Sequence, residues 1–424
     1  MKFVHAADLH LDSPLRGLER YEGAPVERVR GATREALTQL VDLCLEERAD
    51  FLLLVGDLFD GSWRDYSTGL FFARQMTRLR EAATPVVLIR GNHDAESQIT
   101  RNLKLPDNVH ELATQKPETD RQTLAHLGVA LHGQGFATRA VTEDLAARYP
   151  AGLPDHFNLG LLHTSLDGRE GHEPYAPTSL PTLAGKGYDY WALGHVHTRE
   201  VVCRDPWVVF PGNLQGRHVR ETGAKGATVV SVEDHHVALV EHRPLDVLRW
   251  VVREVDVGAA GSADDVLGLA RLALEQAVDG ADGRAVALRL SLRGATRAHA
   301  ALRADPERWE NELRAQANDV GGGSLWLERV GFDTRTPIDL DAVARRDDAL
   351  GELVRSLRQL RGDDAALSAL VQEFGDLRAR LRSGRDGGGG EGPLRLDDPA
   401  WQRALVDDVE QLLVPRLLES LEDG

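Results

Sequence analysis

The feature that most constrains this chain is a set of apolar runs that each end in a short polar motif. Phe51 to Val55 is a continuous apolar run, typical of a strand buried on both faces, and Gly56-Asp57 follows it directly. Residues 26–48 and 68–82 carry apolar side chains at spacings of three and four, which predicts helices. Repetition of strand, helix and strand predicts parallel pairing, with ligands gathered at the carboxyl ends of the strands.

Five polar motifs follow such runs. In chain order they are Asp8-Leu9-His10, Gly56-Asp57-Leu58-Phe59-Asp60, Gly91-Asn92-His93-Asp94, His163, and Gly194-His195-Val196-His197. Any one of them alone is typical of an ordinary turn, but five in series are hard to explain as turns. Carboxylate and imidazole ligands together suit borderline divalent ions such as Mn, Fe, Co or Zn. Since one aspartate can neutralise two cations at once, the series predicts a centre for a pair of metal ions.

The spacing within two motifs bears on where their side chains point. Asp8 and His10 are two residues apart, so on a regular strand they would share one face. His195 and His197 have the same spacing. An extended backbone would send both to one side, whereas a tight bend could divide them between adjacent ions. We interpret His5 as a core histidine rather than a ligand, and two further acidic residues, Asp12 and Asp94, as structural.

This ordered series resembles the calcineurin-like metallophosphoesterases over residues 1–240. The stretch Phe3 to Pro14 and the run from Asp60 to Phe72 are similar to the bacterial DNA repair exonuclease branch, to SbcD and more closely to YhaO-type proteins. The resemblance implies an α/β fold with three parts. They are a four-layer α/β/β/α metallophosphoesterase sandwich over 1–245, a small α/β DNA-capping domain over 246–336, and a helical tail over 337–424 with a flexible linker near 383–397.

The resemblance also implies a role for each motif residue. One ion would be held by Asp8, His10, Asp57 and His197, and the other by Asp57, Asn92, His163 and His195, with Asp57 bridging. His93 would donate a proton to the leaving oxygen. Asp60 would pair with His93 and favour its protonated form. The alternative for His93 is a hydrogen bond to substrate or to a ligand. Manganese is the expected ion, with Fe, Co and Zn as alternatives.

The implied activity is that of a DNA exonuclease at double-strand breaks, with endonuclease activity left open, working with an SMC-like ATPase. A homodimer is also implied. Residues 339–382 and the segment after Asp398-Pro399 carry amphipathic apolar stripes. These stripes either fold back on the chain's own domains or dock a partner coiled coil, which the resemblance implies is that of the ATPase. Two other functions stay open: a small-substrate phosphodiesterase acting on nucleotides, and a mainly scaffolding subunit that binds DNA ends.

Charge and composition restrict the kinds of partner and the location expected for this chain. A formal net charge of −17 argues against non-specific coating of nucleic acid, although two divalent ions would reverse the field of an acidic site. Four basic residues are candidates for DNA contact, and each could equally be a solvated surface charge: Arg16, Arg64, Arg101 and Arg217. The chain has no apolar run of about 18 residues and enters a strand without a signal region, so we expect no membrane span. Cys44 and Cys203 have no nearby partner, which favours structural thiols and a cytoplasmic location.

Elsewhere in the chain, the pattern of apolar, glycine and proline residues predicts a helix over 142–148, a loop over 164–187, a strand over 226–240 and a helix over 297–318. Asp398 and Pro399 should begin the last helix as N-cap and first-turn residue. Pro415 should kink or end that helix.

Overall fold

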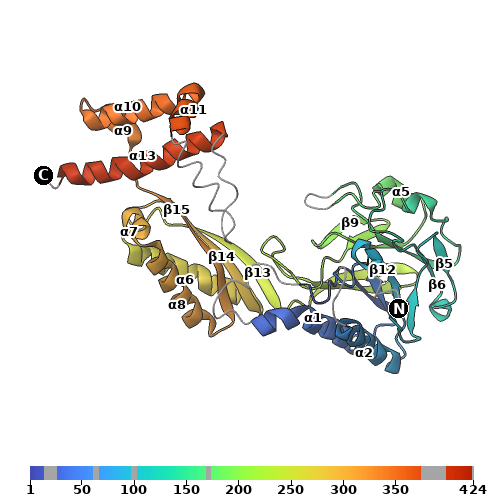
Figure 1. The fold of residues 1–424 in the computed structure, drawn as a ribbon. Coiled ribbons are helices and arrows are strands. Elements are labelled where there is room, and N and C mark those ends of the chain that lie inside the picture. The colour runs from blue at the N-terminus through green and yellow to red at the C-terminus, as the bar shows by residue number, and fades with distance from the viewer. Residues whose placement is uncertain (14–25, 61–65, 97–102, 169–172, 374–397, 423–424) are drawn as a thin grey trace. The chain divides into compact units, whose positions relative to one another are not determined.

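The computed structural model describes residues 1–13, 26–60, 66–96, 103–168, 173–373 and 398–422. The chain divides into two compact units. The first contains Met1–Arg253, Ala273–Leu290 and Arg314–Val330, and the second contains Glu254–Leu272, Ser291–Leu313 and Gly331–Gly424. Two large β-sheets lie in the first unit, and the C-terminal helices lie in the second (Figure 1).

Two six-stranded mixed sheets form the main body of the first unit. In one, the order is β12–β11–β1–β2–β3–β4; β1 to β4 run parallel, and β11 is antiparallel to both neighbours. Its strands are β1 (Lys2–Ala6), β2 (Phe51–Val55), β3 (Val86–Ile89), β4 (Val109–Glu111), β11 (Gly226–Glu233) and β12 (His236–Pro244).

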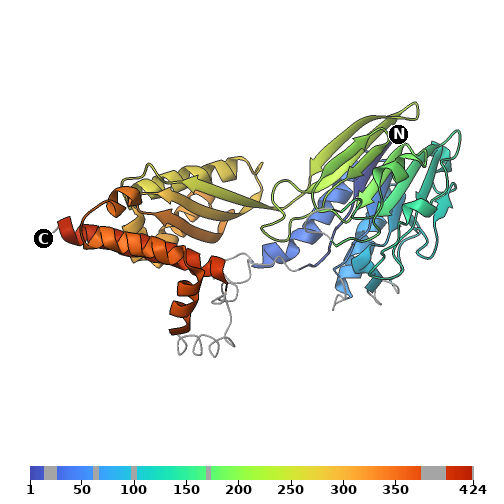
Figure 2. The same ribbon diagram turned by 90° about the horizontal axis from the view of Figure 1, so that it is seen from above.

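The other sheet has the order β5–β6–β7–β8–β10–β9, with the four central strands parallel and the two edge strands antiparallel. Its strands are β5 (Glu118–Asp120), β6 (Val129–Gly133), β7 (Phe157–His163), β8 (Tyr190–Gly194), β9 (Glu200–Arg204) and β10 (Trp207–Phe210). Figure 2 shows the two sheets as adjacent layers.

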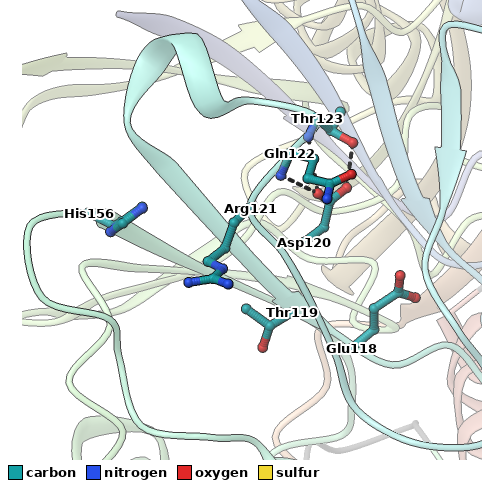
Figure 3. Close-up of a pocket in the computed structure, with 7 residues that line it drawn as sticks. All are labelled: Glu118, Thr119, Asp120, Arg121, Gln122, Thr123 and His156. Atoms are coloured by element: carbon teal, nitrogen blue, oxygen red, sulfur yellow. Dashed lines mark hydrogen bonds between the residues drawn. The ribbon is translucent and has the colours of Figure 1, made fainter.

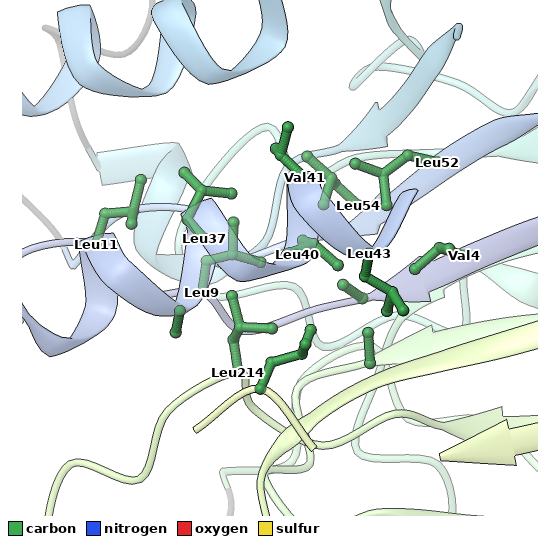
Figure 4. Packing of buried hydrophobic residues seen from close by; sticks show 14 of the residues in the cluster. Val4, Leu9, Leu11, Leu37, Leu40, Val41, Leu43, Leu52, Leu54 and Leu214 are labelled. Carbon is green, nitrogen blue, oxygen red and sulfur yellow. The ribbon is translucent and has the colours of Figure 1, made fainter. Parts of the chain in front are cut away.

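Alternation along β2 explains its unbroken apolar run. Phe51, Leu53 and Val55 face the core between the two sheets, whereas Leu52 and Leu54 face the helices on the outer side. That outer layer consists of α1 (Val26–Glu46) and α2 (Ser67–Glu81), and Figure 4 shows leucines of α1 packed against β2.

A fourth layer covers the outer face of the second sheet, where Trp191 and Leu193 of β8 pack under the short helices α5 (Leu180–Ala184) and η2 (Ala146–Arg148). The short helices α3 (Asn92–Glu96) and η1 (Ala125–Leu127) also lie in this unit. The predicted four-layer α/β/β/α sandwich is confirmed.

A smaller three-stranded sheet follows, in the order β13 (Leu248–Asp256), β14 (Ala285–Ala295) and β15 (Leu325–Arg335). The amide of Val286 donates to the carbonyl of Ser324, and that of Thr296 donates to Arg335. The bonded positions on β14 and β15 thus rise together in residue number, as they do in parallel strands. The connections contain α6 (Ala263–Asp279), α7 (His299–Ala304) and α8 (Pro306–Gly321), so the predicted small α/β pattern is confirmed.

The C-terminal helices are α9 (Leu340–Ala344), α10 (Ala349–Arg361), α11 (Asp364–Glu373) and α13 (Pro399–Glu422). In Figure 1 α13 lies alongside α10 and α11, and Val343, Leu350, Val354 and Val414 form a small core. The Asp398 side chain accepts from the Ala400 amide at 2.9 Å, so the predicted N-cap is present. The helix continues through Pro415, so the expectation that this proline ends it is wrong, and the neighbouring Val414 is buried in the small core.

Four local predictions differ from the structure. Residues 142–148 contain only the η2 turn, where the Asp144 side chain caps Ala147. The strand over 226–240 is β11 and β12, joined by a turn at Asp234-His235. The helix over 297–318 is interrupted at Asp305, because a residue before proline avoids the helical region. The loop over 164–187 contains α5.

No helix in the described part of the chain has the length and apolar character that crossing a bilayer requires.

Candidate metal centre

The polar motifs meet where strands from both sheets end. Asp8 follows β1, Asp57 follows β2 and Asn92 follows β3, while β7 ends at His163 and His195 follows β8. Backbone bonds join the first two motifs: the Asp8 amide donates to Gly56 O and the His10 amide donates to Asp57 O, both at 3.0 Å. The predicted convergence of the motifs is therefore present.

Left-handed backbone conformations at the motif residues set the directions of their side chains. Asp8, His10, Asp57 and His195 have φ values of 53°, 44°, 52° and 95°, in a region that residues with a Cβ seldom adopt. Since β1 ends at Ala6, the expectation that Asp8 and His10 share a strand face is wrong; turns, not strand alternation, bring them together. Strained residues of this kind collect at functional sites.

Two glycines permit the close approach of the motifs. A Cβ on Gly56 would lie 2.3 Å from His163 Nδ1, and one on Gly194 would lie 1.9 Å from Val55 O. Neither position has room for a larger residue, so these glycines set the distance between the ends of β2, β7 and β8.

The predicted ligands form two adjacent groups of donor atoms, and His10 also belongs to a third group with Asp60 and His93. Asp8, His10 and His197 each place one ligand atom within 4.8 Å of the others, and so do Asp57, His163 and His195. In the first group His10 Nε2 and His197 Nε2 are 3.3 Å apart. The tight bend at His195 thus divides the two histidines of its motif between the groups, which is the second of the two geometries considered above.

Asp57 lies between the two groups. Its Oδ2 is 3.5 Å from His163 Nε2 and 3.8 Å from His10 Nε2. Asn92 Oδ1 lies 3.0 Å from His163 Nε2 and adds a neutral oxygen on that side. The carboxylate of Asp57 therefore reaches both groups, as a bridging ligand must.

The second nitrogen of three histidines contacts an acceptor. His163 Nδ1 faces Val55 O at 3.0 Å, His195 Nε2 faces Glu173 O at 2.9 Å, and His197 Nδ1 faces Glu221 Oε1 at 2.7 Å. Carbonyl and carboxylate oxygens only accept, so in the neutral ring the nitrogen facing them carries the proton and the other presents a lone pair. This is the arrangement that metal-binding histidines have.

Because most of the predicted ligands are buried, their charged forms are energetically unfavourable unless a cation neutralises them. Asp8, His10, Asp57, Asn92, His163 and His195 are all buried, and buried charges are normally paired or bound to metals. Burial raises the pKa of Asp8 to about 7. Against the opposing effect of burial, the charge of Asp57 raises the pKa of His163 to about 9. The residues present therefore fit a pair of divalent ions.

His93 and Asp60 lie beside these groups. His93 Nδ1 is 2.9 Å from Asp60 Oδ1, and the His93 amide donates to Asp57 Oδ1 at 3.0 Å. Burial lowers the pKa of His93, but the hydrogen bond to Asp60 and the charges of Asp57 and Asp60 together outweigh it, and the net shift is upward. The same bond, helped by Ser13 Oγ at 2.8 Å, holds the pKa of Asp60 below its usual range. The expected contact is present, and the His93 side chain is 31% exposed.

Residues interpreted as structural have structural contacts. Asp94 accepts from the amides of Leu58, Phe59 and Gly91. His5 is buried, with Nδ1 3.1 Å from the Tyr190 hydroxyl and Nε2 3.0 Å from Leu193 O. Asp12 is paired with the Arg34 guanidinium.

Of the proposed DNA-contacting arginines, Arg16, Arg64 and Arg101 lie outside the described residues. Arg217 lies against His197, with Nη2 3.3 Å from both Glu221 Oε1 and His197 Nδ1. Sequence reasoning missed Glu221, because it stands alone in a loop with no spacing signal.

A hollow of about 600 Å³ lies elsewhere, at the edge strand β5 (Figure 3). Its lining comprises residues 118–123 and His156, and Asp120 accepts from the amides of Gln122 and Thr123. None of the metal-site side chains lines it.

Comparison with known proteins matches two regions of the chain. Residues 1–199 match the family of calcineurin-like phosphoesterases, and residues 250–335 match the middle domain of the metallophosphoesterase YhaO. The chain is 39% identical over 262 residues to the uncharacterized metallophosphoesterase YhaO of Bacillus subtilis, which covers 61% of this chain and 64% of that protein.

Two further relatives carry names that refer to DNA cleavage or repair. The DNA double-strand break repair protein Mre11 of Methanopyrus kandleri is 27% identical over 234 residues, covering 50% of this chain and 48% of that one. One subunit of the nuclease SbcCD of Staphylococcus epidermidis is 22% identical over 274 residues, covering 59% of this chain and 71% of that one. The chain thus spans less than two thirds of the length of YhaO and of this Mre11.

Proposed function

Because the chain belongs to the calcineurin-like metallophosphoesterases, we propose that it is a DNA nuclease that depends on two divalent ions and hydrolyses phosphodiester bonds at DNA ends. Its activity as a metal-dependent phosphoesterase rests on family membership and on the convergent Asp and His side chains. The observation that carries the nuclease proposal is similarity to proteins named for double-strand break repair and for the SbcCD nuclease.

The proposed ligands follow the two groups of donors. Asp8, His10, Asp57 and His197 hold one ion, and Asp57, Asn92, His163 and His195 hold the other. When bound, two such ions lower the pKa of water to give a nucleophile and neutralise charge on the phosphoryl oxygens. Manganese is the proposed ion, and Fe, Co or Zn suits the same donors.

The protonated form of His93 is proposed to act on the leaving group of the reaction. A leaving 3′ or 5′ oxygen needs a proton, and His93 is paired with Asp60 in a way that favours the charged imidazole. The backbone of His93 is fixed by the bond from its amide to Asp57. The ring is thereby held next to the proposed bridging carboxylate and remains accessible to a bound phosphodiester.

The rest of the chain is proposed to serve DNA ends and a partner. Residues 246–336 act as the DNA-capping domain and residues 337–424 as the docking tail for an SMC-like ATPase, in a homodimeric assembly that acts on double-strand breaks. Arg217, beside the metal-site histidines, is proposed to contact a DNA phosphate.

A substrate panel tests the proposal. Purified chain with Mn²⁺ is offered linear duplex DNA, single-stranded DNA and bis-p-nitrophenyl phosphate, alongside Asp57→Ala and the exposed control Asp107→Ala. We expect metal-dependent degradation of duplex from its ends, lost together with both ions in Asp57→Ala and retained in the control. Hydrolysis of the small diester with intact DNA would favour the small-substrate phosphodiesterase, and end binding without hydrolysis would favour the scaffold.

A further inference from the structure

Glu221 is a buried carboxylate directly behind the metal centre. It lies in the loop after β10, and its side chain is 6% exposed. Oε2 accepts from the Arg217 amide at 2.7 Å and from Asn213 Nδ2 at 2.9 Å, while Oε1 lies 2.7 Å from His197 Nδ1. His218 Nε2 is 3.6 Å away. The carboxylate is therefore held from several sides with one oxygen on the imidazole of a metal-site histidine.

The same loop also fixes the backbone of His197. Lys225 Nζ donates to His197 O at 2.7 Å, and the Asn213 amide donates to the same oxygen at 3.4 Å. The ring and the peptide of His197 are thus both attached to the segment from Asn213 to Lys225, and Glu221 makes the attachment to the ring.

The charge of this partner distinguishes His197 from two other histidines of the centre. His163 and His195 direct their second nitrogen to backbone carbonyls, which are neutral. An anionic acceptor strengthens the electron donation of an imidazole to a cation more than a carbonyl does. It also fixes the tautomer, because a carboxylate without a proton can only accept.

We propose that Glu221 is a positioning residue: it accepts the Nδ1–H of His197 and so directs the Nε2 lone pair to the ion shared with Asp8 and His10. The inference rests on the proposed function, because it requires that His197 bind a metal ion. His197 Nε2 lies 3.3 Å from His10 Nε2 and 3.9 Å from Asp8 Oδ1, on the side of the ring opposite to Glu221.

Arg217 gives a second reason why the tautomer of His197 depends on Glu221. Its Nη2 lies 3.3 Å from His197 Nδ1 and 3.3 Å from Glu221 Oε1. With Glu221 present, Nδ1 carries a proton and the guanidinium donates to the carboxylate. Without Glu221, the guanidinium is left beside Nδ1 and, as a donor, favours the tautomer protonated on Nε2. That tautomer cannot bind a cation through Nε2, so Arg217 opposes metal binding once Glu221 is removed.

Stepwise Mn²⁺ binding to the full chain tests this, measured by calorimetry and by electron paramagnetic resonance. Wild type is compared with Glu221→Gln, Glu221→Ala, Glu221→Ala/Arg217→Ala and the exposed control Glu233→Gln. We expect two ions in wild type and in the control. Glu221→Ala should weaken one ion by about 10–100-fold and leave the other unchanged, and removal of Arg217 as well should restore part of the loss.

The outcomes separate the possibilities. Glu221→Gln preserves the shape of the side chain, so it decides the matter if the alanine variant does not fold; weakening of one ion by about tenfold supports the proposal. Equal weakening of both ions would indicate a general structural role and overturn it, as would unchanged binding in every variant. Failure of the wild type itself to bind Mn²⁺ would overturn the metal centre, and the role of Glu221 with it.

Discussion

At the residue scale, the centre depends on side chains whose two polar atoms have different partners. Asp57 directs Oδ2 between His163 and His10, while Oδ1 accepts from the backbone of His93. One carboxylate therefore links the proposed ligand groups to the proposed proton donor. Its burial and its histidine neighbours oppose one another, and the histidines hold the pKa of Asp57 well below its usual range.

Replacing His93 should separate proton donation from metal binding. His93→Ala is expected to reduce turnover on DNA by about 10²–10⁴-fold, because general acid catalysis contributes a factor of this size. Mn²⁺ stoichiometry should stay at the wild-type value, since His93 is not among the proposed ligands. His126→Ala, at an exposed histidine, is the control. Normal cleavage rates in His93→Ala would exclude its role.

His5 should make the stability of the fold depend on pH. Burial lowers its pKa from 6.5 to about 3, so the folded chain holds the neutral ring. A depressed folded pKa gives stability that is complete above pH 6.5 and is lost as the pH falls toward 3. Between pH 7.5 and 5 the contribution lost is about 2 kcal/mol. The free energy of unfolding measured in urea should therefore fall more steeply between pH 7.5 and 5 for wild type than for His5→Gln. An equal fall in the two proteins would contradict the assignment.

At the scale of elements, the ends of neighbouring strands lie so close that the residues following them have no room for a Cβ where they meet. Gly91, after β3, faces Asp57, after β2: a Cβ there would lie 2.2 Å from Asp57 Oδ1 and 2.6 Å from the Asp57 amide nitrogen. The parallel pairing of β2 and β3 thus delivers two motifs to the same edge of the sheet, and glycine lets them meet.

Gly91→Ala should displace the Asp57 carboxylate and lower Mn²⁺ affinity by at least about tenfold, the cost of misplacing a ligand. Gly268→Ala is the matched control, because this glycine lies in α6 with open space around it. The control should gain about 0.5–1 kcal/mol in unfolding free energy and bind metal normally. Equal metal affinity in both variants would show that the approach of β2 and β3 does not set the site.

At the scale of the whole molecule, the C-terminal helices use only part of their apolar surface internally. Val343, Leu350, Val354 and Val414 form a core among the tail helices themselves, so these side chains of the apolar stripes pack within the tail. Leu370, Leu405, Leu413 and Leu417 are each about two-fifths exposed. These exposed leucines are the surface that we propose for docking the ATPase.

Truncation after residue 338 should abolish recovery of the SMC-like ATPase in a pull-down with the tagged chain. In the full-length chain, the double variant Leu405→Asp/Leu413→Asp should reduce recovery to a similar extent, because a charge on an apolar docking surface is costly to bury. Leu239→Asp, at an exposed leucine of β12, is the control. Undiminished recovery with the truncated chain would remove the docking proposal.

The sequence by itself determined the main parallel strands and the motifs at their ends, because apolar periodicity is local and parallel pairing brings carboxyl ends to one edge. The four-layer arrangement was implied by the resemblance to the metallophosphoesterases. Spacing alone could not determine how Asp8 and His10 point, since a left-handed turn replaces the expected strand, or whether His195 and His197 join one group or two. The resemblance, not the spacing, implied their division between two ions. Only the tertiary structure placed Glu221 behind His197 and showed the Asp57 carboxylate within reach of both His10 and His163. Such contacts join residues far apart in the chain, and no spacing within a motif encodes them.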